Sequence, residues 1–352
     1  MIDTVLLGGF DPAAQSLLIG EVVDLLTSPR DLTAVFIEGL AKGSIYLMIA
    51  IGLTLIFGLM DVINFAHGAF TMYGAYLAGS GVLAVGLSSA GLVGSVAGFF
   101  VVLVGVALVL AALGFVLEVA LVRRLYEYPP IFQILLTFGI AITIEELMRM
   151  IVEFRGINDG QWQFGWSSPQ IQTLPSGLRS THEVLFVGFT GIHLLQIAVG
   201  AATAVGIWAF LNRTRYGLFV RAGVEDDEMV EALGINVKRT FTVVFAVGAG
   251  LAGAAGAMLM WDPLWDTSVP LALEVLLPAF VIVIVGGLGS FNGTVVAAYL
   301  VGMIDALQSW SFDTGVVKFT GTAELMIFGI LVVMLIIKPR GLFGVEGQGD
   351  HG

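Results

Sequence analysis

The sequence contains no cysteine, which excludes disulfide bonds, thiol catalysis and cysteine-based metal sites. Its four histidines, at positions 67, 182, 193 and 351, are too scattered to indicate a metal cluster. No Gly-x-x-x-x-Gly-Lys-Ser/Thr phosphate loop occurs, since the stretch around Lys42 has the wrong spacing, and no Ser-His-Asp set stands out. We therefore expect no cofactor, no metal and no enzymatic activity, and any ATP hydrolysis that drives this protein must lie on another chain.

Charged residues are also scarce. They make up 12% of the 352 residues, against 57% hydrophobic residues, and the mean hydropathy is +0.96. A soluble protein of this length needs more polar surface to cover its core. The net charge of −12 argues against a nucleic-acid partner. The composition therefore indicates a protein embedded in the lipid bilayer.

Apolar runs of about 20 residues, the length a helix needs to cross a bilayer, recur along the chain. We predict an all-α polytopic membrane protein with about nine transmembrane helices, at 35–57, 69–84, 96–122, 131–152, 191–211, 240–261, 271–285, 294–307 and 322–337. The transmembrane domain would cover residues 35–344, between an N-terminal extension (1–34) and a C-terminal tail (345–352). Segment 13–26 is compatible with an interfacial amphipathic helix, and the first residues lack the basic region of a cleaved signal peptide.

The distribution of Lys and Arg predicts the orientation, because cytoplasmic loops carry the excess of these residues. With nine spans, one side holds nine basic residues, namely Arg123, Arg124, Arg213, Arg215, Arg221, Lys238, Arg239, Lys338 and Arg340. The other side holds four, namely Arg30, Arg155, Arg179 and Lys318. We therefore predict a multi-pass protein of the cell (inner) membrane with its N-terminus outside and its C-terminus in the cytoplasm. The polar loop 213–239 faces the cytosol and the loop 153–190 faces outward.

The loop 213–239 contains a stretch, Val224–Leu233, that we predict to be a short amphipathic helix. Acidic residues open it, where they suit the positive end of the helix dipole, and a glycine follows where a helix stop would sit. The residues concerned are Glu225 and Asp226 in the first turn, Met229, Ala232 and Leu233 on an apolar edge, and Gly234 at the stop. Such a helix could dock on a cytosolic partner, and the alternative is a solvated connector between two spans.

The stretch GAGLAG (Gly248–Gly253) matches the dinucleotide-binding pattern, but it lies inside an apolar span without a preceding strand. Helix packing is the better interpretation. Gly248, Ala252 and Gly256 are spaced by four, and Gly253 adds to a face without bulky side chains. We therefore expect another helix to approach this face closely.

Polar residues inside the spans are candidates for function, because they are costly in lipid. Asn64 and His67 lie in a polar break between the first two spans, where they either line a substrate pathway or satisfy the backbone. Two charge pairs, Glu38 with Lys42 and Glu145 with Arg149, are each four residues apart, so each can pair on one helix face in a structural role.

Four motifs together resemble the LivH-like permease subunits of the ABC importers for branched-chain amino acids. They are GLAKGSIYLMIAIGLTLIFGLMDVINFAHGAFTMYGAYLAG (Gly39–Gly79), RAGVEDDEMVEALGIN (Arg221–Asn236), VGGLGSFNGTVVAAYLVG (Val285–Gly302) and IIKPRGLFG (Ile336–Gly344). The resemblance covers residues 35–344 in the right order. The first 30 or so residues and the loop 153–190 match poorly.

This resemblance implies an importer with two permease chains, two cytosolic ABC ATPase chains and an extracytoplasmic solute-binding protein. It assigns the helix Glu225–Leu233 to a groove of the ATPase. Branched-chain or other hydrophobic amino acids are the first choice of substrate, and urea or short-chain amides are the alternative within the family. An ion-coupled secondary transporter is a weaker alternative, since it would need carboxylates near the middle of broken helices, and a channel or structural membrane protein is another.

Overall fold

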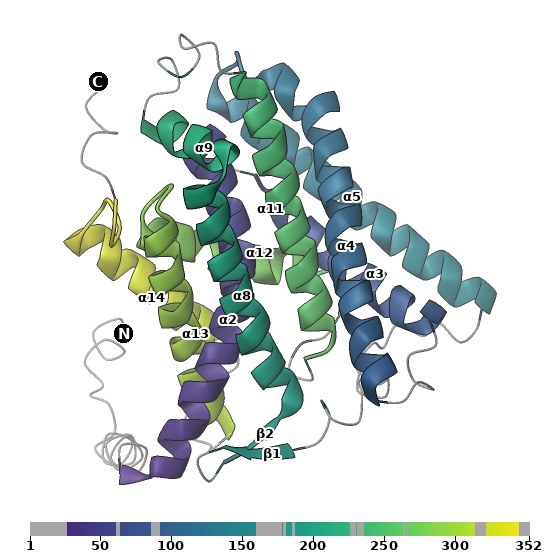
Figure 1. Ribbon diagram of the computed structural model, residues 1–352, viewed down its shortest axis with the longest axis vertical. Coiled ribbons are helices and arrows are strands. Elements are labelled where there is room, and N and C mark those ends of the chain that lie inside the picture. Colours follow the sequence, from purple (N-terminus) through teal and green to yellow (C-terminus); the bar gives the residue numbers. More distant parts are fainter. Residues whose placement is uncertain are drawn as a thin grey trace, which may run out of the picture.

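The computed structural model of the chain describes residues 27–60, 64–85, 92–159, 178, 181–184, 187–225, 230, 236–262, 265, 267–313 and 322–344 (Figure 1). Nearly all of them are helical. The long helices are α2 (Pro29–Met60), α3 (Ala66–Val85), α4 (Leu92–Ala120), α5 (Pro130–Asp159), α8 (Gly191–Arg213), α11 (Val237–Met260), α12 (Leu271–Gly286), α13 (Phe291–Asp313) and α14 (Thr322–Ile337). Shorter elements are the 3-10 helix η2 (Val122–Leu125), the helix α9 (Arg215–Glu225) and the strands β1 (Thr181–Val184) and β2 (Val187–Thr190).

Each predicted span coincides with one of these helices. Within the part of the chain that the structure describes, five helical segments are long and apolar enough to cross a membrane, at Pro29–Gly58, Val96–Leu125, Pro130–Phe154, Gly191–Arg213 and Val237–Met260. Leu271–Gly286 and Leu325–Ile337 are shorter apolar helices. The described residues thus have the architecture of an all-α polytopic membrane protein, while the count of nine spans and the orientation of the termini stay predictions.

Two short elements differ from the sequence-based expectation. The loop 153–190 contains an antiparallel hairpin in which Thr181 pairs with Thr190 and Val184 with Val187. These β-branched residues favour extended backbone, a signal too short to distinguish from a loop in the sequence.

Residues 1–26 and the tail 345–352 lie outside the described residues, so the interfacial helix at 13–26 is not tested.

The predicted helix Val224–Leu233 is described only at Val224, Glu225 and Val230, each of which is helical, so its full course stays a prediction. The structure adds a helix that was not predicted, α9 at Arg215–Glu225, which begins nine residues before Val224 and ends just after the predicted helix would begin. The cause is local, because the hydroxyl of Thr214 accepts a hydrogen bond from the backbone N–H of Gly217 at 3.0 Å and starts the helix there. Val230 is helical and buried, and the neighbouring residues 226–229 and 231–235 lie outside the described part of the chain.

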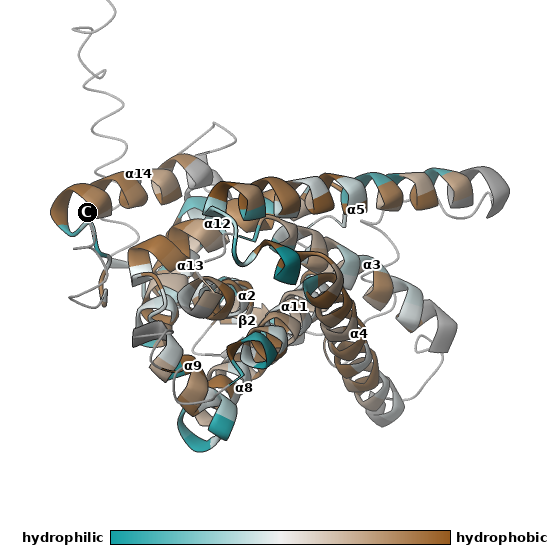
Figure 2. Cartoon of the chain, turned by 90° about the horizontal axis from the view of Figure 1, so that it is seen from above, coloured by the Kyte–Doolittle hydropathy of each residue, from teal (hydrophilic) through white to brown (hydrophobic). Residues whose placement is uncertain are grey.

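Helix α11 lies in the middle of the bundle and packs against α2, α3 and α4, while α13 packs along α2 (Figures 1 and 2). Glycines allow these close approaches. A Cβ on Gly52 of α2 would lie 2.8 Å from the carbonyl oxygen of Gly248 on α11. Because lipid supplies no hydrophobic drive between helices, such close backbone packing is a main source of cohesion in the bundle.

The turn between α12 and α13 is joined to the end of the chain. Gly287 has φ +102° and Gly341 has φ +78°, backbone angles that favour glycine. The N–H of Leu342 donates to the carbonyl of Val285 at 2.8 Å, and the N–H of Phe343 donates to Gly286 at 3.0 Å. The segment after α14 is therefore held on this turn by backbone hydrogen bonds.

Candidate functional site

Asn64 and His67, the two predicted pathway residues, are fully buried at the start of α3. The Oδ1 of Asn64 accepts a hydrogen bond from the N–H of Ala66 at 3.1 Å and so caps the helix. The Nε2 of His67 lies 2.9 Å from the carbonyl oxygen of Ile49 on α2. Because a carbonyl oxygen can only accept, Nε2 carries the proton and Nδ1 of the neutral ring is an acceptor.

This contact places the beginning of α3 deep in the bundle. Ile49 lies eleven residues before Met60, the end of α2, which is about 16 Å of helix. Helix α3 therefore starts well inside the membrane-spanning part of the chain. Its first turn, where Asn64 accepts hydrogen bonds from the N–H groups of Ala66 and His67, presents the positive end of the helix dipole at that depth. A non-helical segment at membrane depth is tolerated where protein or water covers it.

Three polar atoms at this place have no hydrogen-bond partner among the described residues. They are Nδ2 of Asn64, Nδ1 of His67 and the hydroxyl of Thr71, each in a residue with 0% exposure. Such unpaired buried groups are rare, so each needs a water, a ligand or another partner. Thr71 was not among the predicted residues, although its spacing of four from His67 places both on one face of α3. Together they offer an amide donor, a ring acceptor and a hydroxyl.

The predicted coupling residues are mostly beyond what the structure describes. Glu225 is the last residue of α9, whereas Asp226, Met229, Ala232, Leu233 and Gly234 lie outside the described residues. Helix α9 itself contacts α8, α2 and α11. The segment that follows it leads into α11, whose first turn is capped by Asn236 through a 3.0 Å hydrogen bond from the N–H of Arg239.

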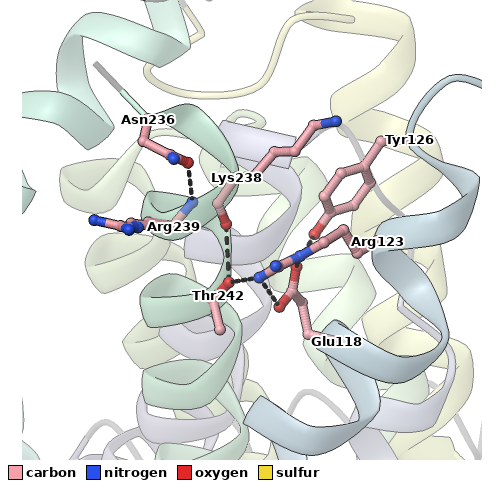
Figure 3. A network of polar contacts seen from close by, with 7 residues as sticks. All are labelled: Glu118, Arg123, Tyr126, Asn236, Lys238, Arg239 and Thr242. Carbon is pink, nitrogen blue, oxygen red and sulfur yellow. Dashed lines mark hydrogen bonds and ion pairs between the residues drawn. The ribbon is translucent and has the colours of Figure 1, made fainter. Parts of the chain in front are cut away.

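A buried carboxylate lies beside this start of α11 (Figure 3). Glu118, at the end of α4, is fully buried and accepts two hydrogen bonds from Arg123 of η2, at 3.1 Å from Nε and 3.0 Å from Nη2. The hydroxyl of Tyr126 donates to the same carboxylate at 2.6 Å. Arg123 also donates to the hydroxyl of Thr242 on α11. The network ties the connection between α4 and α5 to α11, next to the predicted coupling segment.

The protonation of Tyr126 supports this arrangement. Burial, together with the neighbouring carboxylate of Glu118, raises the pKa of the Tyr126 phenol above its ordinary value. The hydroxyl therefore remains a hydrogen-bond donor at physiological pH. This arrangement is not recognisable from the sequence, because the tertiary fold brings Thr242 of α11 to Arg123 and Glu118.

The four predicted packing residues of α11 are all buried, and the GAGLAG stretch lies wholly within the helix. A Cβ on Gly253 would lie 2.8 Å from Cγ of Leu110 on α4, and one on Gly248 would lie 2.9 Å from the carbonyl oxygen of Gly52. Gly256 meets the backbone of Thr71 on α3, and Ala252 is fully buried. These positions face α2, α3 and α4, so the small residues of α11 allow three neighbouring helices to pack closely against it.

A buried ion cluster joins α2 to α13. The Nζ of Lys42 lies 3.2 Å from Glu38, which confirms the predicted pairing, and 3.0 Å from Oδ1 of Asp305 on α13. Lys42 also donates to the hydroxyl of Ser309 at 2.6 Å, and Tyr46 donates to Oδ2 of Asp305 at 2.7 Å. The partners on α13 are not recognisable from sequence spacing.

The second predicted pair differs in one partner. The carboxylate within salt-bridge distance of Arg149 belongs to Glu146, at 3.7 Å, rather than to Glu145. Both spacings, three and four, place residues on one helix face, so the sequence could not choose between the two neighbouring glutamates. Across the ranges that the structure describes, no group of three or more His, Cys, Asp or Glu residues is placed to hold a metal ion.

Comparison with known proteins identifies one family. The family model described as "Branched-chain amino acid transport system / permease component" matches residues 35–336. The permease protein LivH of the high-affinity branched-chain amino acid transport system of Escherichia coli K12 is 25% identical over 316 residues, covering 87% of this chain and 94% of LivH. BraD of Pseudomonas aeruginosa is 26% identical over 316 residues, covering 88% and 94%. LivM of Salmonella typhimurium is 27% identical over 313 residues, covering 85% and 67%. No solved structure matches the chain.

Proposed function

Because this chain belongs to the family of branched-chain amino acid transport permease components, we propose that it is the membrane-spanning subunit of an ATP-driven importer for branched-chain or other hydrophobic amino acids. The observation that carries the proposal is the match of the family model to residues 35–336, most of the chain. The proposed partners are two cytosolic ABC ATPases, a second permease chain and an extracytoplasmic solute-binding protein.

The similarity to two differently named permeases supports the second permease chain. LivH and LivM are both named as permease proteins of high-affinity branched-chain amino acid transport systems, and this chain is similar to each. The partner is therefore proposed to be a homologous chain or a second copy of this one.

We propose that the segment Glu225–Leu233 couples the permease to the ATPase. The position of Glu225 at the end of α9, followed by the entry into α11, supports this role, since motion of the segment would reach the central helix of the bundle directly. ATP binding would close the ATPases, pull on the segment and rock the spans between inward-open and outward-open states. Asn64 and His67, with Thr71, are proposed to contact solute or water on its path, and their unpaired buried atoms support that role.

The importer differs from an ion-coupled transporter or a channel in two testable ways. It has ATPases and a second permease as partners, and it needs Glu225 and Asp226 for coupling. Gentle purification of the tagged chain from its native membrane should recover two ATPases and a second permease. In that complex, Glu225→Lys with Asp226→Lys should uncouple ATP hydrolysis from uptake. The matched control is Glu127→Lys, a charge reversal outside the proposed coupling segment, on a side chain that is 87% exposed.

Normal uptake by the Glu225→Lys/Asp226→Lys variant would contradict the coupling role. Purification of the chain without ATPases, together with proton- or sodium-driven uptake, would instead establish the ion-coupled transporter. Uptake assays with labelled leucine, urea and acetamide then separate amino acids from urea and short-chain amides as the substrate of the same machine.

A further inference from the structure

Helix α5 exposes charged groups in the part of the chain that spans the membrane. Its apolar span is Pro130–Phe154. Within that span the side chain of Glu146 is 60% exposed and that of Arg149 is 54% exposed, and the hydroxyl-bearing Thr143 is exposed one turn earlier. Charged side chains of membrane helices almost always face a protein interior or an aqueous cavity rather than lipid.

Glu146 and Arg149 lie in the second half of the apolar span of α5. Glu146 lies 16 residues after Pro130, which is about 24 Å along the helix, and eight residues, or about 12 Å, before Phe154 at the end of the span. Figure 1 shows α5 running obliquely to α4, so its depth across the membrane is less than its length. Glu146 and Arg149 are 3.7 Å apart, but this pairing leaves more than half of each side chain exposed.

Other helices of the bundle expose a different kind of surface. Glu118 is the one charged residue of α4, and it is buried, while the exposed side chains of that helix include Val101, Leu108 and Phe115. Helix α8 has no charged residue before Arg213, its last residue. These two helices have the surface expected against lipid, and they lie across the molecule from α5 in Figure 2. The exposed surfaces of α4 and α8 therefore differ from that of α5, which carries the charges.

On that side of the molecule, the exposed surface of α5 is followed by exposed residues of α12. The ring of Phe65, between α2 and α3, lies 5.9 Å from Phe138 of α5 and 5.4 Å from Phe280 of α12, so this side chain bridges the two helices. Helix α12 exposes Leu273, Glu274 and Leu277. Seen from above, α14, α12 and α5 line one edge of the molecule (Figure 2).

We propose that the exposed face of α5 and the adjoining exposed residues of α12, here called the α5–α12 face, is the surface on which a second permease chain packs. The occupant is argued from chemistry, because the face combines large apolar side chains with a Glu–Arg pair inside the span, and another membrane-embedded protein can match both. Glu146 and Arg149 then meet polar groups of the second chain. This inference rests on the proposed function, which supplies two permease chains.

The absence of such charges from α4 and α8 provides a matched test. A photo-crosslinking amino acid replaces Leu147 or Met150 on α5, which are 49% and 61% exposed, or Leu108 on α4 or Val205 on α8, both 66% exposed, as controls. After irradiation in native membranes, mass spectrometry identifies the adducts. We expect a permease adduct from the two α5 positions and none from the controls. Adducts that form equally from the controls, or α5 adducts only with lipid or with the binding protein, overturn the proposal.

The composition of the purified complex separates this outcome from the proposed function. If the ATPases and a second permease are recovered while the α5 positions give no permease adduct, the α5–α12 face is wrong and the importer stands. If no ATPase or other permease is recovered, the importer fails, and an adduct between two copies of this chain at Leu147 still supports the face. If neither the partner proteins nor a permease adduct is found, both the importer and the α5–α12 face are overturned.

A second variant gives opposite results for a protein interface and for lipid. The double substitution Glu146→Leu/Arg149→Leu should reduce recovery of the second permease with the tagged chain by about tenfold or more, because its polar partners lose their counterparts. If the face met lipid, removing two charges would leave the complex intact and raise the thermal unfolding temperature of the isolated chain. That result would overturn the proposal.

Discussion

The ammonium of Lys42 lies 3.0 Å from the carboxylate of Asp305, although 263 residues separate the two in the chain. Their side chains are 7% and 11% exposed, and Tyr46 and Ser309 complete the hydrogen bonding around them. The pair therefore fastens α2, near the start of the bundle, to α13, near its end.

Breaking this pair should destabilise the bundle strongly. Lys42→Met leaves the carboxylate of Asp305 buried without its cation, and such a loss typically costs about 3–5 kcal/mol. Thermal unfolding in detergent measures the change. The double variant Lys42→Met/Asp305→Leu should recover most of the lost stability, because no buried charge of the pair then remains unpaired. Equal losses in the single and double variants would contradict this account.

Bulk at Gly253 should interfere with helix packing. Gly253→Leu places new atoms against Leu110 on α4, where a Cβ alone would come within 2.8 Å, and overpacking of this kind costs about 1–3 kcal/mol or more. The matched control is Gly206→Leu on α8, where a Cβ would have no atom within 4 Å. We expect the first variant to extract poorly and to lose uptake, and the second to resemble the parent. A Gly253→Leu protein that extracts and transports normally would refute close packing at this face.

The hydrogen-bond network around Glu118 should stabilise the folded protein mainly through the negative charge of this carboxylate. Glu118→Gln removes the anion that faces Arg123, and the expected loss is about 1–3 kcal/mol, since a hydrogen bond to a charged group is worth more than a neutral one. Tyr126→Phe removes a single donor and should cost about 1 kcal/mol. As an exposed reference, Glu127→Gln breaks only the 3.7 Å pair with Lys238 and should change stability by about 0–1 kcal/mol. Unfolding in detergent ranks the three, and a ranking in which Glu127→Gln matches Glu118→Gln would be inconsistent with the buried network.

The unpaired Nδ1 of His67 allows a structural role to be separated from a pathway role. In His67→Gln the side-chain amide can still donate to the carbonyl of Ile49, but the ring acceptor is lost. If Nδ1 contacts solute or water on the path, uptake should fall by about tenfold, the equivalent of one hydrogen bond, with little change in thermal stability. Lowered stability with normal uptake would assign His67 to the structure alone.

The positions of the spans were predictable because hydrophobic length is a local property of the sequence. The contacts between spans were not. Asp305 reaches Lys42, and Arg123 reaches Thr242, only through the packing of helices distant in the chain. Where local spacing left a choice, as for Glu145 and Glu146 beside Arg149 on the same helix, the side-chain conformations decided which carboxylate comes within salt-bridge distance. Helix α9 was not predicted although its start has a local cause, because Thr214 is a helix-starting residue inside a basic segment.

The candidate site was predictable in part for the same reason. A polar break between two apolar runs indicated Asn64 and His67, since such residues are exceptional in a span. Thr71 lies in an apolar stretch as one more small residue. The hydroxyl of Thr71 is recognised as buried and unpaired only in the structure, where the hydrogen bond from His67 to Ile49 places the beginning of α3 deep in the bundle.

The backbone hydrogen bonds from Leu342 and Phe343 to the α12–α13 turn also have a consequence for biogenesis. The ribosome must synthesise nearly the entire polypeptide before the turn at Gly286–Gly289 can acquire these partners. Insertion of the earlier helices into the bilayer therefore precedes the closing of this joint. A nascent chain that stops short of Leu342 therefore lacks these two backbone hydrogen bonds.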